Sequence, residues 1–123
     1  MLYGLLFQEK GKIEFMETIR TSDDIRRALS HSYDEPVYIY KHSHTCPFNA
    51  RAQGEVVRLK HDYPIYGLVV QYVKELSNEI AEKLDVEHET PQAILVKEGE
   101  AVAVLSHEAI TAKAMLTALK EQR

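Results

Sequence analysis

The chain has 123 residues, 45% of them hydrophobic, which is enough for one ordinary domain with a buried core and too few to argue for two. Fifteen Lys and Arg against 19 Asp and Glu give a formal net charge of -4, which argues against a general binder of nucleic acid or of anionic membranes. No apolar stretch has the length of a membrane span. The apolar start, Met1 to Phe7, follows no basic region, so we expect no signal peptide. The single cysteine cannot form an internal disulfide, and we expect a cytoplasmic protein.

The first predicted elements are a helix and a strand. Thr21 and Asp24 have the spacing of a capping box, and the apolar residues behind them, Ile25, Ala28 and Leu29, form a helical stripe. Residues 34–36, Asp-Glu-Pro, end this helix, and residues 37–40 are typical of a buried strand. Residues 13–19, before this helix, are a candidate for a further strand.

The middle of the chain repeats this alternation. Residues Phe48, Ala52, Val56 and Leu59 lie on one face of a helix that begins after Cys46 and ends at Tyr63 and Pro64. The continuous apolar run 65–70 predicts a strand covered on both faces. Ser77 is the expected cap of the next helix, whose inward residues are Ile80, Ala81 and Leu84.

A hairpin and a last helix complete the predicted fold. Residues 93–96 and 101–105 are expected to pair across a turn at residues 98–100. Ser106 is the expected cap of the last helix, which contains Ile110, Ala114, Met115, Ala118 and Leu119. Parallel strands joined by helical crossovers, followed by an antiparallel hairpin, predict an α/β fold with a small mixed sheet and helices on both faces.

Cys46 is predicted to be a reactive thiolate. It follows the first core strand, and Pro47 suits the first turn of a helix, so the sulfur would face the free amide groups of that turn. No Asp or Glu occurs from residue 41 to 54, whereas Lys41, His42, His44 and Arg51 can carry positive charge. Both features favour the thiolate over the thiol.

Two further positions bear on this thiol. Asn49 stands three residues after Cys46, where a dithiol motif has its second cysteine, so no neighbouring thiol can resolve a mixed disulfide. Pro91 precedes the hairpin, and the Thr90–Pro91 bond is a candidate cis peptide because proline weakens the trans preference.

Three segments resemble the monothiol bacilliredoxin family of the thioredoxin-like superfamily. They are Lys-His-Ser-His-Thr-Cys-Pro at 41–47, His-Glu-Thr-Pro-Gln at 88–92 and Ser-His-Glu-Ala-Ile-Thr at 106–111. The resemblance covers about residues 16–119, so residues 16–123 are expected to form one thioredoxin-like domain with a mixed four- to five-stranded sheet, and residues 1–15 an extension. The family usually has a small apolar residue and serine after Cys-Pro, where this chain has Phe48 and Asn49, and it has serine where this chain has Thr90.

The resemblance implies a monothiol thiol-disulfide oxidoreductase that takes bacillithiol from capped client proteins. Cys46 would be the catalytic nucleophile. Thr45, Pro47, Asn49, Thr90 and Pro91 would contact the bound thiol, and Lys41, His42, His44 or Arg51 could meet the malate carboxylates of bacillithiol. No cofactor would be bound; bacillithiol would be the co-substrate, and bacillithiol or a system that reduces bacillithiol disulfide would regenerate the thiol. No nucleic acid or membrane partner is expected, and we expect a monomer.

Other interpretations stay open at this point. A monothiol glutaredoxin-like carrier would use Cys46 and an external thiol to hold an iron-sulfur cluster between two protomers. A non-enzymatic interaction module would keep the fold with a buried, inert Cys46. His42, His44 and Cys46 alternate and could ligate a metal on an extended strand, but a helical position for Cys46 would turn its sulfur away, and no metal site is predicted. His88 and His107 are expected to be structural, through bonds to backbone groups or as caps.

Overall fold

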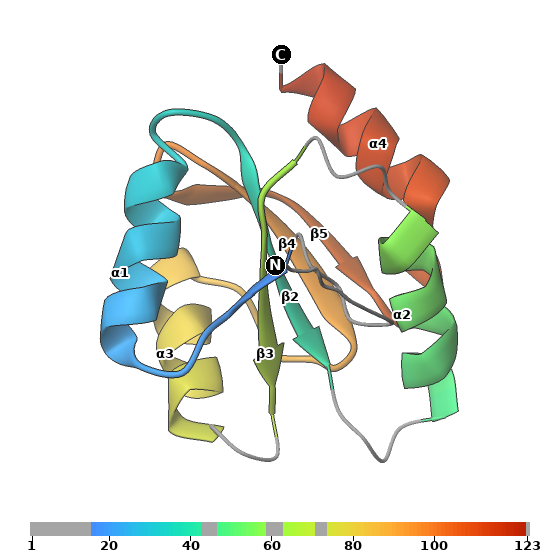
Figure 1. The fold of residues 1–123 in the computed structure, drawn as a ribbon, viewed down its shortest axis with the longest axis horizontal. Helices are drawn as coiled ribbons and strands as arrows, with labels where there is room; N and C mark the ends of the chain where they lie inside the picture. Colours follow the sequence, from blue (N-terminus) through green and yellow to red (C-terminus); the bar gives the residue numbers. More distant parts are fainter. Residues whose placement is uncertain (1–15, 43–46, 59–62, 71–73, 123) are drawn as a thin grey trace, which may run out of the picture.

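The computed structural model describes residues 16–42, 47–58, 63–70 and 74–122, and its ribbon is shown in Figure 1. The strands are β1 (Met16–Thr18), β2 (Val37–His42), β3 (Ile65–Val69), β4 (Gln92–Lys97) and β5 (Glu100–Ser106). The helices are α1 (Ser22–His31), α2 (Pro47–Arg58), α3 (Lys74–Leu84) and α4 (Ala112–Glu121), with a short 3-10 helix, η1 (His107–Ala109). Among these helices none has the length and apolar character of a membrane span.

The strands form one mixed sheet in the order β1-β3-β2-β4-β5. β1, β3 and β2 are parallel, whereas β4 is antiparallel to β2 and β5 is antiparallel to β4. The predicted hairpin is confirmed, and its turn places Glu98 at a φ of 54° and Gly99 at 79°, the left-handed values that a tight hairpin turn requires. Of the further strand predicted over residues 13–19, the described part is β1 alone.

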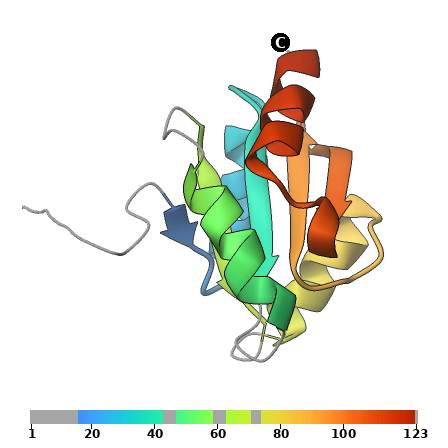
Figure 2. The same ribbon diagram turned by 90° about the vertical axis from the view of Figure 1, so that its right-hand side faces the viewer.

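Helices cover both faces of the sheet, as predicted. α1 and α3 lie on one face, and α2 and α4 lie on the other (Figures 1 and 2). Alternate residues of β2 therefore enter two different cores: Val37 and Ile39 pack under α1 and α3, and Tyr38 and Tyr40 pack under α2 and α4. Burial on both faces explains why residues 37–40 of β2 are hydrophobic without alternation.

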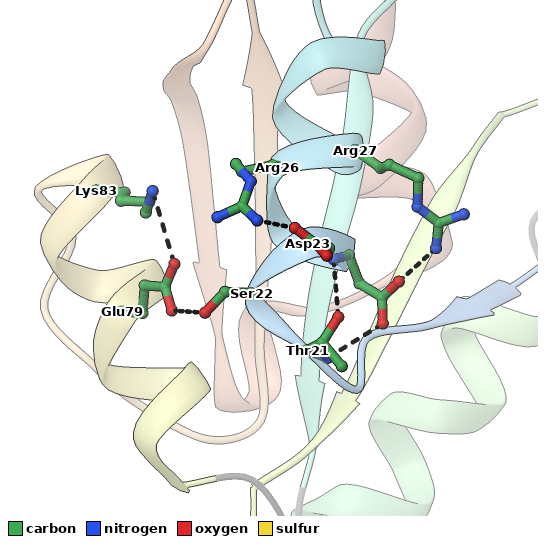
Figure 3. Close-up of polar contacts among 8 residues, drawn as sticks. Thr21, Ser22, Asp23, Arg26, Arg27, Glu79 and Lys83 are labelled. Atoms are coloured by element: carbon green, nitrogen blue, oxygen red, sulfur yellow. Dashed lines mark hydrogen bonds and ion pairs between the residues drawn. The ribbon is translucent and has the colours of Figure 1, made fainter.

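The start of α1 shows why the chain becomes helical at this point. The Thr21 side chain accepts a hydrogen bond from the backbone N–H of Asp24, and the Asp24 carboxylate accepts one from the backbone N–H of Thr21, so the predicted capping box is confirmed. Directly after Thr21, the Ser22 hydroxyl donates to Glu79 of α3 at 2.6 Å, and Lys83 pairs with the same carboxylate (Figure 3). These contacts join the two helices that cover this face.

Two predicted caps are wrong. α3 begins at Lys74, so Ser77 lies inside the helix, buried, where its hydroxyl meets the His88 ring. Ser106 precedes η1 without a side-chain cap, and α4 is instead capped by Thr111, whose hydroxyl accepts from the Ala114 N–H at 3.0 Å. In both places a polar residue precedes an apolar stripe in the sequence. Ser77 is instead held inside α3 by its contact with His88, and η1 lies between Ser106 and the start of α4.

Two tyrosines on one face of β2 allow a matched test of the core. Tyr38 donates to the carbonyl oxygen of Met115 in α4 at 2.9 Å, whereas the buried Tyr40 hydroxyl has no hydrogen-bond partner among the described residues. Tyr38→Phe should lower the free energy of unfolding by about 1 kcal/mol because it deletes a satisfied buried bond. Tyr40→Phe should be neutral or stabilising. Urea unfolding of both variants measures the difference, and equal losses would contradict it.

Candidate functional site at the end of strand β2

The predicted nucleophile follows the central strand of the sheet. β2 ends at His42 and α2 begins at Pro47, so the chain passes within a few residues from a buried strand to a helix start. Thr45, Cys46 and His44 lie outside the described residues, as do the side chains of Pro47, Phe48 and Asn49. The site is therefore built here from the elements that surround this connection.

The Thr90–Pro91 segment lies beside the same end of β2. Lys41 is paired with Gln92 in the antiparallel register of β2 and β4, so Pro91, one residue earlier, enters the sheet next to His42. The Thr90–Pro91 peptide bond is cis, which confirms the prediction. The carbonyl oxygen of Pro91 accepts a hydrogen bond from the backbone N–H of His107 at 3.0 Å. This bond fixes the segment against the start of η1.

Lys41 is placed differently from what the sequence predicted. Its side chain is fully buried, with 0% exposure, and its Nζ lies 2.9 Å from Nδ1 of His88. Burial lowers the pKa of the Lys41 ammonium to about 8, against a weaker opposing attraction from Glu89. Because Lys41 shares the face of Ile39, under α1 and α3, it is not available at the surface to meet the carboxylates of a bound thiol.

His88 was expected to have a structural role, through backbone bonds or as a cap; its described contacts join it to two other side chains. Nδ1 of the ring lies 2.9 Å from Lys41 Nζ and 2.9 Å from the Ser77 hydroxyl oxygen. Burial of the ring, and then the positive charge of Lys41, lower the pKa of His88. An ammonium can only donate, so Nδ1 is the acceptor and the neutral ring carries its proton on Nε2.

The other predicted cations have separate surroundings. Arg51 is exposed on α2, and its guanidinium donates to the carbonyl oxygen of Glu108 at 3.4 Å. His42 stacks on Tyr40 with ring centroids 5.1 Å apart, on the face of α2 and α4. Thus Lys41 and His42 point to opposite faces of the sheet, and of the three predicted cations that the structure describes, His42 and Arg51 lie on the side of α2.

No group of three or more His, Cys, Asp or Glu residues within the described segments is arranged to hold a metal ion. Of the three residues of the metal alternative, His42, His44 and Cys46, the last two are outside those segments. His107, the other histidine predicted to be structural, contributes backbone groups: its N–H donates to Pro91 and its carbonyl accepts from Ile110.

Sequence reasoning missed the contact among Lys41, Ser77 and His88. One signal was present, because Lys41 continues the alternation of Val37 and Ile39 and so occupies an inward position of a buried strand. A lysine at such a position is rarely buried without a partner. The identity of the partner was not predictable, since 47 residues separate Lys41 from His88.

The activation predicted for Cys46 is open to a direct measurement. Its rate of alkylation by iodoacetamide should follow a titration with an apparent pKa below the ordinary cysteine value of roughly 8.5. The cause would be the start of α2 and the absence of acidic residues from 41 to 54. Rates are measured from pH 5 to 10 by intact mass. A midpoint at or above the ordinary value would contradict activation.

Comparison with known proteins agrees with this arrangement. A solved structure described as a proposed oxidoreductase with a thioredoxin fold superimposes with a TM-score of 0.77 at 29% identity, over 87% of this chain and 98% of its own. Thioredoxin f from spinach chloroplast, in its short form, gives a TM-score of 0.64 at 16% identity, over 86% and 91%. Fasciola hepatica thioredoxin gives 0.67 at 14%, over 88% and 100%. The fold is thus thioredoxin-like.

The family model described as monothiol bacilliredoxin BrxC matches residues 17–115. This range runs from within β1 to the first turn of α4, and it contains Cys46 and the segment at Pro91. The match therefore covers every element that surrounds the site. The chain belongs to the monothiol bacilliredoxin family.

Proposed function

We propose that this protein is a monothiol thiol-disulfide oxidoreductase that removes bacillithiol from capped client proteins. Family membership supports thiol redox chemistry in general. The observation that carries the proposal is at one end of the sheet: β2 ends at His42 and α2 begins at Pro47, so Cys46 lies between them in sequence, and Pro91 enters β4 beside the end of β2. In the proposed site, the Cys46 thiolate would lie next to the backbone groups of this segment, which would pair with an incoming disulfide.

In the proposed reaction, the Cys46 thiolate attacks the bacillithiol sulfur of the client's mixed disulfide. The sulfur-sulfur bond to the client breaks, its electron pair leaves with the client sulfur, and that thiolate takes a proton from water. The new disulfide joins Cys46 to bacillithiol. Because Asn49 cannot supply a second thiol, the thiolate of a second bacillithiol or of a redox partner must then attack the bacillithiol sulfur, which releases a disulfide of bacillithiol with that thiol and restores Cys46.

Several described groups support steps of this reaction. The N–H of His107 fixes the carbonyl oxygen of Pro91, so the backbone of Thr90 keeps a defined orientation toward a ligand. Arg51, on α2, and His42, at the end of β2, are the described cations on the side of α2 that remain candidates for the malate carboxylates. Lys41 is no longer a candidate for contact with these carboxylates because it is buried.

The test is a transfer experiment followed by intact mass spectrometry. A client protein carrying one bacillithiol cap is mixed with the reduced native protein, and both masses are recorded over time. We expect the client to lose one bacillithiol while this protein gains one. The same client capped with glutathione is the matched substrate. Equal rates for the two caps would contradict bacillithiol specificity, and no transfer from either would contradict the oxidoreductase assignment.

A further inference from the structure

A small polar cluster lies inside the face of the sheet opposite α2. It consists of Lys41 on β2, Ser77 on α3 and His88 in the connection from α3 to β4, and both other side chains meet Nδ1 of His88 at 2.9 Å. Lys41 and Ser77 are almost completely buried, at 0% and 1% exposure. The proposed transfer reaction uses none of these three side chains directly.

This cluster anchors the connection that carries the Thr90–Pro91 segment. Residues 85–91 run from the end of α3 to the start of β4, and His88 is near their middle. The buried amide of Gln92 donates from Nε2 to the carbonyl oxygen of Glu87 at 2.9 Å, and Pro91 accepts from the N–H of His107. Of these three described attachments, only the one at His88 involves an imidazole, whose charge can change under mildly acidic conditions.

Protonation of His88 is incompatible with this contact. Nδ1 accepts from the Lys41 ammonium, so a proton on Nδ1 would place donor against donor and one positive charge against another at 2.9 Å. His88 is exposed, so the charged ring has a route to water. Turning toward water would break the attachment to both Lys41 and Ser77.

We propose that Lys41 and His88 are positioning residues that hold the Thr90–Pro91 segment in place for disulfide exchange, and that protonation of His88 releases it. The proposal rests on the proposed function, because it assigns that segment to the binding of the incoming disulfide. The protein would then bind capped clients well at neutral pH and poorly in mildly acidic conditions, with Cys46 still present and reactive.

The surroundings of the cluster leave few other groups to explain such a pH response. Glu89, in the same connection, attracts both Lys41 and the charged form of His88. β3 contributes Leu68 and β4 contributes Gln92 at positions paired with Lys41, and neither titrates. α3 contributes the neutral Ser77. Glu89→Gln should therefore shift the release to lower pH, because it removes the carboxylate that favours protonated His88.

The experiment follows the full-length native protein by NMR between pH 5 and 8. The ring nitrogens of His88 report its protonation, and the His107 amide, which donates to Pro91, reports the attachment of the segment. We expect the ring to be the Nε2–H tautomer at pH 7.5, and the His107 amide to exchange roughly tenfold faster, after correction for the intrinsic rate, once His88 is protonated.

His88→Asn is the decisive variant because its Oδ1 accepts a hydrogen bond and does not titrate. It should keep the His107 amide protected throughout this range, and the KM for a capped client should no longer rise at low pH. His88→Phe, which has a ring but no acceptor, should show fast exchange and the raised KM at every pH. Lys41→Met, which removes the ammonium that donates to Nδ1, should also reduce the change of His107 amide exchange and of KM between pH 5 and 8.

His31→Asn is the matched control. His31 also contacts two side chains, Tyr66 and Glu35 at 2.8 Å, but it lies near the other end of the same face. Its loss should not change the exchange of the His107 amide. An Nδ1–H tautomer in the native protein, or an unchanged pH response in His88→Asn, would overturn the proposal. Absence of bacillithiol transfer at every pH would overturn the proposed function instead, and the NMR readouts would still decide the positioning of the segment.

Discussion

Cys46→Ser should abolish transfer of bacillithiol from a capped client. A serine hydroxyl remains protonated at neutral pH and is a poor nucleophile toward sulfur, so the replacement removes the reacting group with almost no change in volume. The native protein should gain the mass of one bacillithiol, and the variant should gain none while the client keeps its cap. Because this is the single cysteine of the chain, no second thiol can substitute for it.

The control for this experiment is the folded state of the variant. Cys46→Ser and the native protein should unfold at similar urea concentrations, because the substitution exchanges one atom, sulfur for oxygen, and changes the side-chain volume little. Cys46→Ala should give the same loss of transfer. Removal of the cap by either folded variant would show that the reaction does not pass through Cys46.

The fold was predictable because strong local signals agree with the long-range pattern. The capping box at Thr21 and Asp24, the apolar run of β3 and the hairpin turn at Glu98 and Gly99 each specify one element, and alternation of helix and strand then leaves few topologies. Cys46 and Pro91 were recognised because their positions in the chain, after one strand and before another, follow from that order.

The side-chain environment of the site was less predictable. Lys41 was expected near the thiol because it is close to Cys46 in sequence, but alternation along β2 turns it to the other face, where it meets residues from α3 and the following connection. Ser77 was expected to cap α3 and instead lies buried within it. Both errors have one cause: a local pattern does not contain the tertiary partner that decides where a polar side chain goes.

Burial of Lys41 has a consequence for stability that can be measured without any activity assay. The pKa of Lys41 is about 8 in the folded protein, and the ordinary value is 10.5. Between these two values the unfolded chain binds more protons than the folded one, so the free energy of unfolding must rise with pH. The rise attributable to Lys41 should total about 3 kcal/mol.

Lys41→Met isolates this contribution because methionine has similar length and no charge. Burial raises the pKa of Tyr38 and of Tyr40, so ionisation of these tyrosines in the unfolded chain opposes the rise above about pH 10 in both proteins. The difference between native and variant cancels that effect. Urea unfolding at intervals from pH 7 to 10.5 gives the free energy of unfolding of both proteins. The difference between them should be constant below pH 8 and then grow in favour of the native protein.

At neutral pH the variant should be the more stable protein, since it no longer buries an ammonium whose described hydrogen-bond partner is a neutral ring. A difference that does not change with pH would mean that Lys41 reaches water in the folded state.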